Sequence, residues 1–148
     1  YLIIAGPGYD DNYCRKLYNK VSGSPLLADR IIFTGMLNGN SKWGAIYNCE
    51  SLILPSHHEN FGVVVVEALA CAKPVLISKK VNIWNEIYDE GGGLFEDDTL
   101  DGTFKLLCDW LQLDEIKKSE MRRRALETYQ KYYSVQNSAI NFEQLLKS

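Results

Sequence analysis

Short apolar runs alternate with longer amphipathic stretches along most of the chain. The runs are rich in aliphatic residues and bounded by Gly, Pro or Ser, which is typical of buried strands. The amphipathic stretches repeat apolar residues three or four positions apart, which predicts helices that cover a sheet. We expect strands at residues 1–5, 30–34, 51–54, 75–77 and 94–95.

Helices are expected between these strands and after the last one. They are predicted over residues 12–21, from a cap at Ser41 through Tyr47, over 62–72 and over 83–88. Three more helices are expected. The first begins at residues 97–99, the second begins at Asp114 and breaks at 132–134, and the third covers residues 135–146. The alternation predicts one Rossmann-like α/β domain with a doubly wound parallel sheet, whose ligands bind at the carboxyl ends of the strands.

Residues 55–72 connect the third and fourth expected strands, and they hold a turn, two carboxylates and an apolar run. The four valines at 63–66 are β-branched and by local propensity favour a strand. A parallel crossover, however, needs about a dozen residues, usually as a helix, and residues 67–70 are strong helix formers. We therefore predict a helix that begins at Gly62.

The start of this helix is a candidate anion site. Unpaired N–H groups and the helix dipole favour a phosphate there, and Gly62 lets a ligand approach the backbone closely. Asn60 is expected to cap the first turn. Glu59 and Glu67 would repel a phosphate and are better suited to accept hydrogen bonds from sugar or ribose hydroxyls beside it. By themselves, two such acids are more often solvated surface charges.

The composition is that of an ordinary globular domain, with 46% hydrophobic and 24% charged residues. No apolar run is long enough to span a bilayer and nothing resembles a signal peptide. We therefore expect a cytoplasmic protein whose full-length form is at most peripheral to the inner face of a membrane. The net charge of -3 argues against a nucleic-acid partner. Basic residues at 117, 118 and 122–124 gather on one predicted helix, and the ordinary interpretation of such a cluster is a helix face exposed to solvent.

Cysteine and histidine residues give no sign of a metal centre. The four cysteines are irregularly spaced without a C-x-x-C pair, so we expect reduced interior thiols. The adjacent His57 and His58 would point apart on an extended turn and could not share one ion. We expect neither a metal nor a cofactor.

The residues around the predicted helix follow the order of a known signature. In order, these residues are Leu54-Pro55-Ser56, Glu59-Asn60-Phe61-Gly62, four valines, Glu67-Ala68-Leu69-Ala70 and Lys73-Pro74-Val75. This order resembles the E-x7-E region of retaining, nucleotide-sugar-dependent glycosyltransferases with the GT-B fold, group 1, family 4. The resemblance extends over nearly the whole chain, as the second, donor-binding half of such an enzyme. The chain departs from the pattern at residues 79–82, where many members carry a glycine pair, which leaves a sugar contact from this loop without support.

The resemblance implies a role for each matching residue. Gly35 and Met36 would hold the nucleotide base through backbone groups, although Gly35 is equally well explained as a simple turn glycine. Glu59 would contact hydroxyls of the transferred sugar at the catalytic centre, and Glu67 would hold the ribose hydroxyls. Backbone N–H groups for the sugar and the distal phosphate would come from Asn60, Phe61, Gly62 and Val63.

The implied reaction is transfer of a hexose from a nucleotide diphosphate sugar to a glycan, lipid or small-molecule acceptor, with retention of configuration. The chain begins directly with a strand, so we expect residues 1–148 to be an N-terminally truncated donor-binding domain whose acceptor-binding domain is missing. We expect this piece alone to be inactive. The alternative hypothesis is a non-catalytic nucleotide-binding or regulatory interaction module with the same fold.

Overall fold

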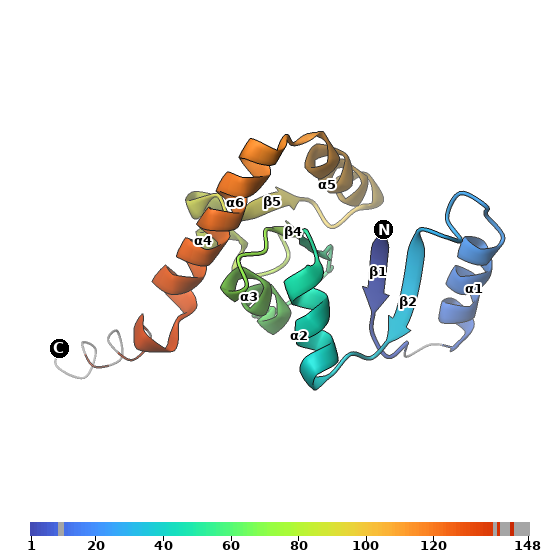
Figure 1. The fold of residues 1–148 in the computed structure, drawn as a ribbon, viewed down its shortest axis with the longest axis horizontal. Coiled ribbons are helices and arrows are strands. Elements are labelled where there is room, and N and C mark those ends of the chain that lie inside the picture. The colour runs from blue at the N-terminus through green and yellow to red at the C-terminus, as the bar shows by residue number, and fades with distance from the viewer. Residues whose placement is uncertain (9–10, 138, 140–142, 144–148) are drawn as a thin grey trace. The chain divides into compact units, whose positions relative to one another are not determined.

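The strands pair in parallel within two sheets in the computed structural model, which describes residues 1–8, 11–137, 139 and 143 (Figure 1). The sheets belong to two compact units, Tyr1–Gly44 and Ala45–Ser148. Helices connect the paired strands, as parallel pairing requires. The predicted parallel α/β class is confirmed. The strands are β1 (Leu2–Ala5), β2 (Ile31–Gly35), β3 (Leu52–Leu54), β4 (Val75–Ser78) and β5 (Gly93–Glu96).

The first unit is built on a strand–helix–strand motif. α1 (Asp11–Ser22) connects β1 to β2, which align with Leu2 opposite Ile31. The ring of Tyr18 on α1 lies 5.0 Å from that of Phe33 on β2, measured between centroids, so the helix packs against the strand that follows it.

The next helix, α2 (Gly39–Asn48), begins two residues before its predicted cap. Ser41 lies within the first turn, where its hydroxyl donates to the carbonyl oxygen of Asn38 at 2.7 Å. The prediction that Ser41 caps this helix is therefore wrong. Serine hydroxyls readily form such local bonds to backbone carbonyls, which compete with a capping role.

The second unit contains a three-stranded sheet in the order β3-β4-β5. α3 (Val63–Ala70) connects β3 to β4, and α4 (Trp84–Glu90) connects β4 to β5. The predicted helix over the four valines is confirmed. Its Val65 and Leu69 are completely buried, so packing of the crossover helix outweighs the strand preference of β-branched residues.

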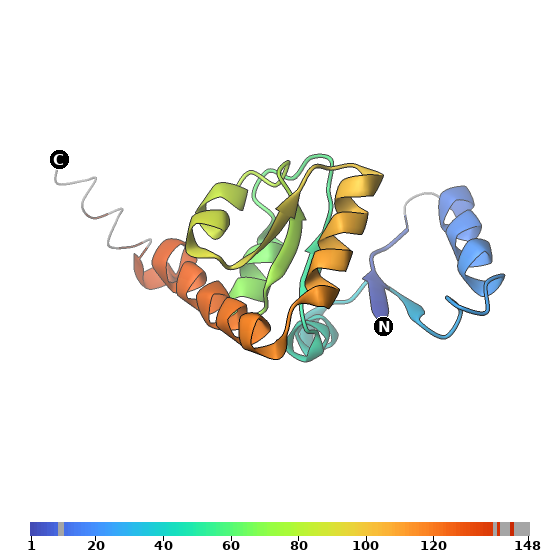
Figure 2. The same cartoon turned by 90° about the horizontal axis from the view of Figure 1, so that it is seen from above.

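Helices cover both faces of this sheet, which makes it doubly wound. Val75 and Ile77 of β4 pack in one cluster with residues of α3, α4 and α6 (Glu115–Thr128). Leu76, which points to the opposite face, packs with Leu106 and Trp110 of α5 (Leu100–Gln112). Figure 2 shows α5 on one side of β4 and β5, with α3 and α4 on the other.

α5 and α6 begin where the sequence predicts helices, and each begins with a side-chain cap. Thr99 accepts a hydrogen bond from the Gly102 amide at 3.0 Å, and Asp114 accepts one from the Lys117 amide at 2.8 Å. After α6 the chain continues as a π-helix, Tyr129–Tyr133, and the predicted break comes at Ser134. The predicted helix over residues 135–146 lies largely outside the described residues. Within the described part of the chain, no helix is both long and apolar enough to cross a membrane.

Candidate functional site

The carboxyl end of β3 leads into a turn over residues 59–62 that places the amino end of α3. Gly62 adopts a left-handed backbone conformation with φ of 68°. An added Cβ there would lie 3.2 Å from Val65 Cγ2 and 3.3 Å from Val81 Cγ1. Both the backbone angle and the close packing therefore favour glycine at the start of the helix.

Backbone hydrogen bonds attach this turn to the loop after β4. The Glu59 amide donates to the Lys80 carbonyl at 3.2 Å, and the Asn82 amide donates to the Glu59 carbonyl at 3.1 Å. Glu59 also forms a parallel bridge with Val81. The Glu59 backbone is thereby fixed at the carboxyl ends of β3 and β4.

The side chains of the turn do not form the predicted helix cap. Asn60 Oδ1 accepts a hydrogen bond from Asn82 Nδ2 at 3.2 Å, whereas Glu59 Oε1 accepts one from the Gly62 amide at 3.2 Å. The residue that precedes α3 is Gly62, which offers no side-chain cap. The prediction that Asn60 caps the helix is therefore wrong, because its side chain is bonded to the neighbouring loop.

The first turn of α3 presents amides to a ligand. Gly62 O accepts from the Val65 amide at 2.8 Å and from the Val66 amide at 3.2 Å. Val63 and Val64 precede these residues, at positions where a helix offers its amides no intrahelical partner. The amino end of α3 thus has the backbone chemistry of an anion site.

The other predicted residues of this stretch lie on or beside the same helix. Glu67 is half-buried and lies four residues after Val63, so the two side chains share one helix face. Val63 is 63% exposed and Phe61 is 48% exposed. The Phe61 ring meets the ring of Tyr133 edge to face at a centroid distance of 6.1 Å. Glu59 and the turn thus lie at the amino end of α3, and Glu67 lies in the second turn of that helix.

Gly35 and Met36 lie at the carboxyl end of β2, in the first compact unit. Gly35 has φ of 68°, and its carbonyl accepts a hydrogen bond from the Gly6 amide at 3.0 Å. Met36 is 55% exposed. Gly35 ends a parallel strand and Met36 follows it, on the side where such sheets bind ligands.

Two polar contacts near the turn were not anticipated from the sequence. His57 Nδ1 and Asp98 Oδ2 are 3.0 Å apart and connect the loops that follow β3 and β5. The hydrogen bond from His57 lowers the pKa of the Asp98 carboxyl. The hydroxyl of the buried Ser78 donates to the carbonyl of Ser56, which ties the ends of β4 and β3. The only available signal was the position of these residues at strand ends, because they are far apart in the chain.

Lys79, in the loop after β4, is paired with an acid from the loop after β5. Lys79 Nζ lies 3.5 Å from Asp97 Oδ1 in an exposed ion pair. Among the residues that the structure describes, no three His, Cys, Asp or Glu side chains gather closely enough to hold a metal ion.

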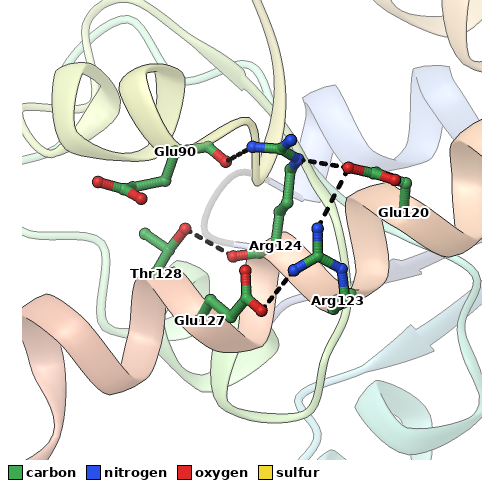
Figure 3. Close-up of polar contacts among 6 residues, drawn as sticks. All are labelled: Glu90, Glu120, Arg123, Arg124, Glu127 and Thr128. Atoms are coloured by element: carbon green, nitrogen blue, oxygen red, sulfur yellow. Dashed lines mark hydrogen bonds and ion pairs between the residues drawn. The ribbon is translucent and has the colours of Figure 1, made fainter.

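The basic cluster on α6 is largely paired with acids on the same helix (Figure 3). Arg123 lies 2.5 Å from Glu127 and 3.2 Å from Glu120, and Arg124 Nε lies 2.9 Å from Glu120. Arg124 also donates to the carbonyl of Glu90 at 3.3 Å. The bonds from Arg124 and Arg123 lower the pKa of Glu120. These charges stabilise the helix surface and its contact with α4.

A parallel α/β layer with a helix amino end at the carboxyl end of a strand defines a Rossmann-like domain of the kind that binds nucleotides or phosphates. Residues 1–128 match the family described as Glycosyl transferases group 1, and the chain belongs to this family.

Relatives of known sequence are also glycosyltransferases. An uncharacterized glycosyltransferase from Methanocaldococcus jannaschii is 27% identical over 114 residues, which are 74% of this chain and 28% of that protein. The alpha-D-kanosaminyltransferase of Streptomyces kanamyceticus is 30% identical over 89 residues, 60% of this chain and 22% of that protein. The chain thus spans 28% and 22% of the lengths of these relatives.

Solved structures of this type share the fold. Anabaena HepE in complex with UDP-glucose superposes with a TM-score of 0.78 at 20% identity, over 99% of this chain and 40% of that one. The fold is therefore the Rossmann-like fold of a GT-B glycosyltransferase domain, as the sequence predicted.

Proposed function

We propose that this chain is the donor-binding part of a retaining hexosyltransferase and that it binds a nucleotide diphosphate sugar at the amino end of α3. The observation that carries the proposal is the turn of residues 59–62, which fixes one carboxylate beside unpaired helix amides, with a second carboxylate one turn further along. The UDP-glucose complex of HepE is consistent with such a ligand, since that protein has the same fold.

In this proposal each part of the ligand has its own partner. The backbone amides of Asn60, Phe61 and Val63 take the sugar and the distal phosphate, and Gly62 permits their close approach. Glu59 uses one oxygen for the Gly62 amide, which orients the carboxylate so that its second oxygen accepts a sugar hydroxyl. Glu67 accepts hydrogen bonds from the ribose hydroxyls. Gly35 and Met36 belong to the first compact unit, and their contact with the base stays a prediction from the sequence.

The chemistry proposed for this site is stabilisation of the leaving group. The bond between the anomeric carbon and the distal phosphate oxygen breaks, and the diphosphate leaves with the electron pair. The acceptor oxygen bonds to the anomeric carbon on the same face and gives its proton to the departing phosphate. Helix amides and the dipole of α3 stabilise the growing negative charge, so the mechanism requires no metal ion.

Titration of the chain with UDP-glucose, GDP-mannose and ADP-glucose tests the proposal. We expect at least one of them to bind in calorimetry and to shift the NMR amide signals of residues 59–67. If none of the three binds, the donor proposal is wrong and a non-catalytic module becomes the better explanation. Binding that shifts only signals outside this stretch would also contradict it.

A further inference from the structure

A groove lies in the Ala45–Ser148 unit, along β5, at the edge of its sheet. Its volume is about 650 Å³, which is within the range of small-molecule sites. It is lined by Trp84 and Tyr88 of α4 and by Lys105, Leu106 and Asp109 of α5, the helices that lie on either side of β5 in Figure 2. Among the described residues that line it, none belongs to the turn of residues 59–62 or to α3.

The wall on the α4 side is aromatic. The rings of Trp84, Tyr88 and Phe95 form a cluster with centroid distances of 5.9–6.1 Å and tilted or edge-to-face contacts. Tyr88 is 62% exposed although it belongs to this cluster. This wall therefore offers ring surface to a ligand.

The wall on the α5 side is charged but balanced. Lys105 pairs with Glu96 and lies 3.8 Å from Asp109. The hydrogen bond with Glu96 raises the pKa of Lys105, so the lysine stays charged at neutral pH. With Lys79 at one end, the groove contains two positive and two negative side chains. It offers hydrogen-bond donors and acceptors without net charge.

We propose that this groove binds a neutral carbohydrate, as a sugar site separate from the proposed donor site. A pyranose has an apolar C–H face that can lie on the aromatic wall, and hydroxyls that can donate to Glu96 and Asp109 and accept from Lys105. A nucleotide or another strongly charged ligand would gain little from balanced walls. The inference does not depend on the proposed donor site.

The test is an NMR titration of the chain with maltohexaose, cellohexaose and mannohexaose. We expect at least one oligosaccharide to shift the Trp84 indole signal and the amide signals of β5, and UDP-glucose not to displace it. Tyr88→Ala should weaken this binding about tenfold, whereas Tyr88→Phe, which keeps the ring, should bind within about twofold of the wild type.

Leu111→Ala is the matched control, since Leu111 is a 75% exposed residue of α5 that does not line the groove. It should leave the affinity unchanged, and the amide spectra of all variants should confirm that they are folded. The proposal is overturned if no oligosaccharide shifts these signals or if Tyr88→Ala and Leu111→Ala bind equally.

Discussion

Glu67 is the residue whose proposed role can be tested most directly. A hydrogen bond to a charged group contributes about 1.5 to 3 kcal/mol, so Glu67→Gln should weaken nucleotide-sugar binding roughly ten- to a hundredfold. Calorimetric titration measures the change. Asp89→Asn, on the exposed surface of α4, is the matched removal of one charge and should leave the affinity unchanged. Equal affinities of wild type and Glu67→Gln would remove this carboxylate from the site.

Gly62 combines a left-handed backbone with close neighbours, so its replacement should destabilise the second unit. Gly62→Ala should cost at least the roughly 1–2 kcal/mol of a left-handed non-glycine residue, because Val65 and Val81 leave little room for a Cβ. Urea unfolding measures the loss.

Gly91→Ala is the control for that substitution. Gly91 also has a left-handed backbone, with φ of 75°, but its added Cβ would meet Arg124 Cδ, which belongs to a flexible exposed side chain. The loss for Gly62→Ala should therefore exceed the loss for Gly91→Ala. Equal losses of stability would mean that close packing around Gly62 adds nothing to the cost of the left-handed backbone conformation.

The residue types of the turn could be predicted from the sequence, but their hydrogen bonds could not. An Asn shortly before a helix is a common cap, and this expectation failed because Asn82 supplies a partner for Asn60 from another loop. The bond between His57 and Asp98 joins residues 41 positions apart. Such pairs depend on which strand ends lie next to each other in the sheet, and local propensity does not predict this.

At the scale of elements, the sequence was most informative where connectivity constrains the answer. Local propensity alone would make the valines of α3 a strand, yet the need to connect two parallel strands correctly predicted a helix. The start of α2 was misjudged, because a serine inside a first turn resembles a serine that precedes it. The π-helix after α6 has no simple sequence pattern and was not foreseen.

We propose that the π-helix positions Phe61 in the turn of residues 59–62. Tyr133 ends this element and contacts Phe61 edge to face, and such ring pairs contribute about 0.5–1.5 kcal/mol. Tyr133→Leu and Phe61→Leu should therefore be less than additive in a double-mutant cycle on the free energy of unfolding. Strict additivity would show that the two rings are not coupled.

The Tyr133 hydroxyl provides a second test of the same contact. Among the described residues it has no hydrogen-bond partner, and burial raises its pKa, with a further contribution from Glu86. Tyr133→Phe keeps the ring and removes an unsatisfied polar group, so stability should be unchanged or higher. A clear loss of stability in thermal unfolding would mean that the hydroxyl has a partner after all.

At the scale of the whole molecule, the chain corresponds to a minor part of its relatives, 28% and 22% of their lengths. We propose that the acceptor is held by a part of the protein outside these residues. The chain alone should therefore bind a donor without transferring its sugar, which an assay of nucleoside diphosphate release from UDP-glucose would measure. Acceptor-dependent release by the chain alone would refute this.

Surface ion pairs should make the stability of the whole chain depend on pH in a defined direction. Hydrogen bonds from Lys131 and Tyr132 lower the pKa of Glu90, and His57 and Arg124 have the same effect on Asp98 and Glu120. A carboxyl whose pKa is lower in the folded state contributes stability above its unfolded value, about 4, and loses it as pH falls through the folded value.

The urea midpoint should therefore stay nearly constant between about pH 5 and 8 and fall below about pH 4. Raised salt should weaken the effect, because these groups are exposed and screened.

Glu90→Gln should lower the urea midpoint at pH 7 and make its fall at acid pH shallower, since the substitution removes a carboxyl whose protonation differs between the folded and unfolded states. At the alkaline end the sign is reversed. The pKa values of Lys105 and Lys131 are raised by their acid partners, so their contribution is present at neutral pH and should be lost as pH rises through those raised values. A midpoint that did not change between pH 5 and pH 3 would mean that these bonds do not persist in solution.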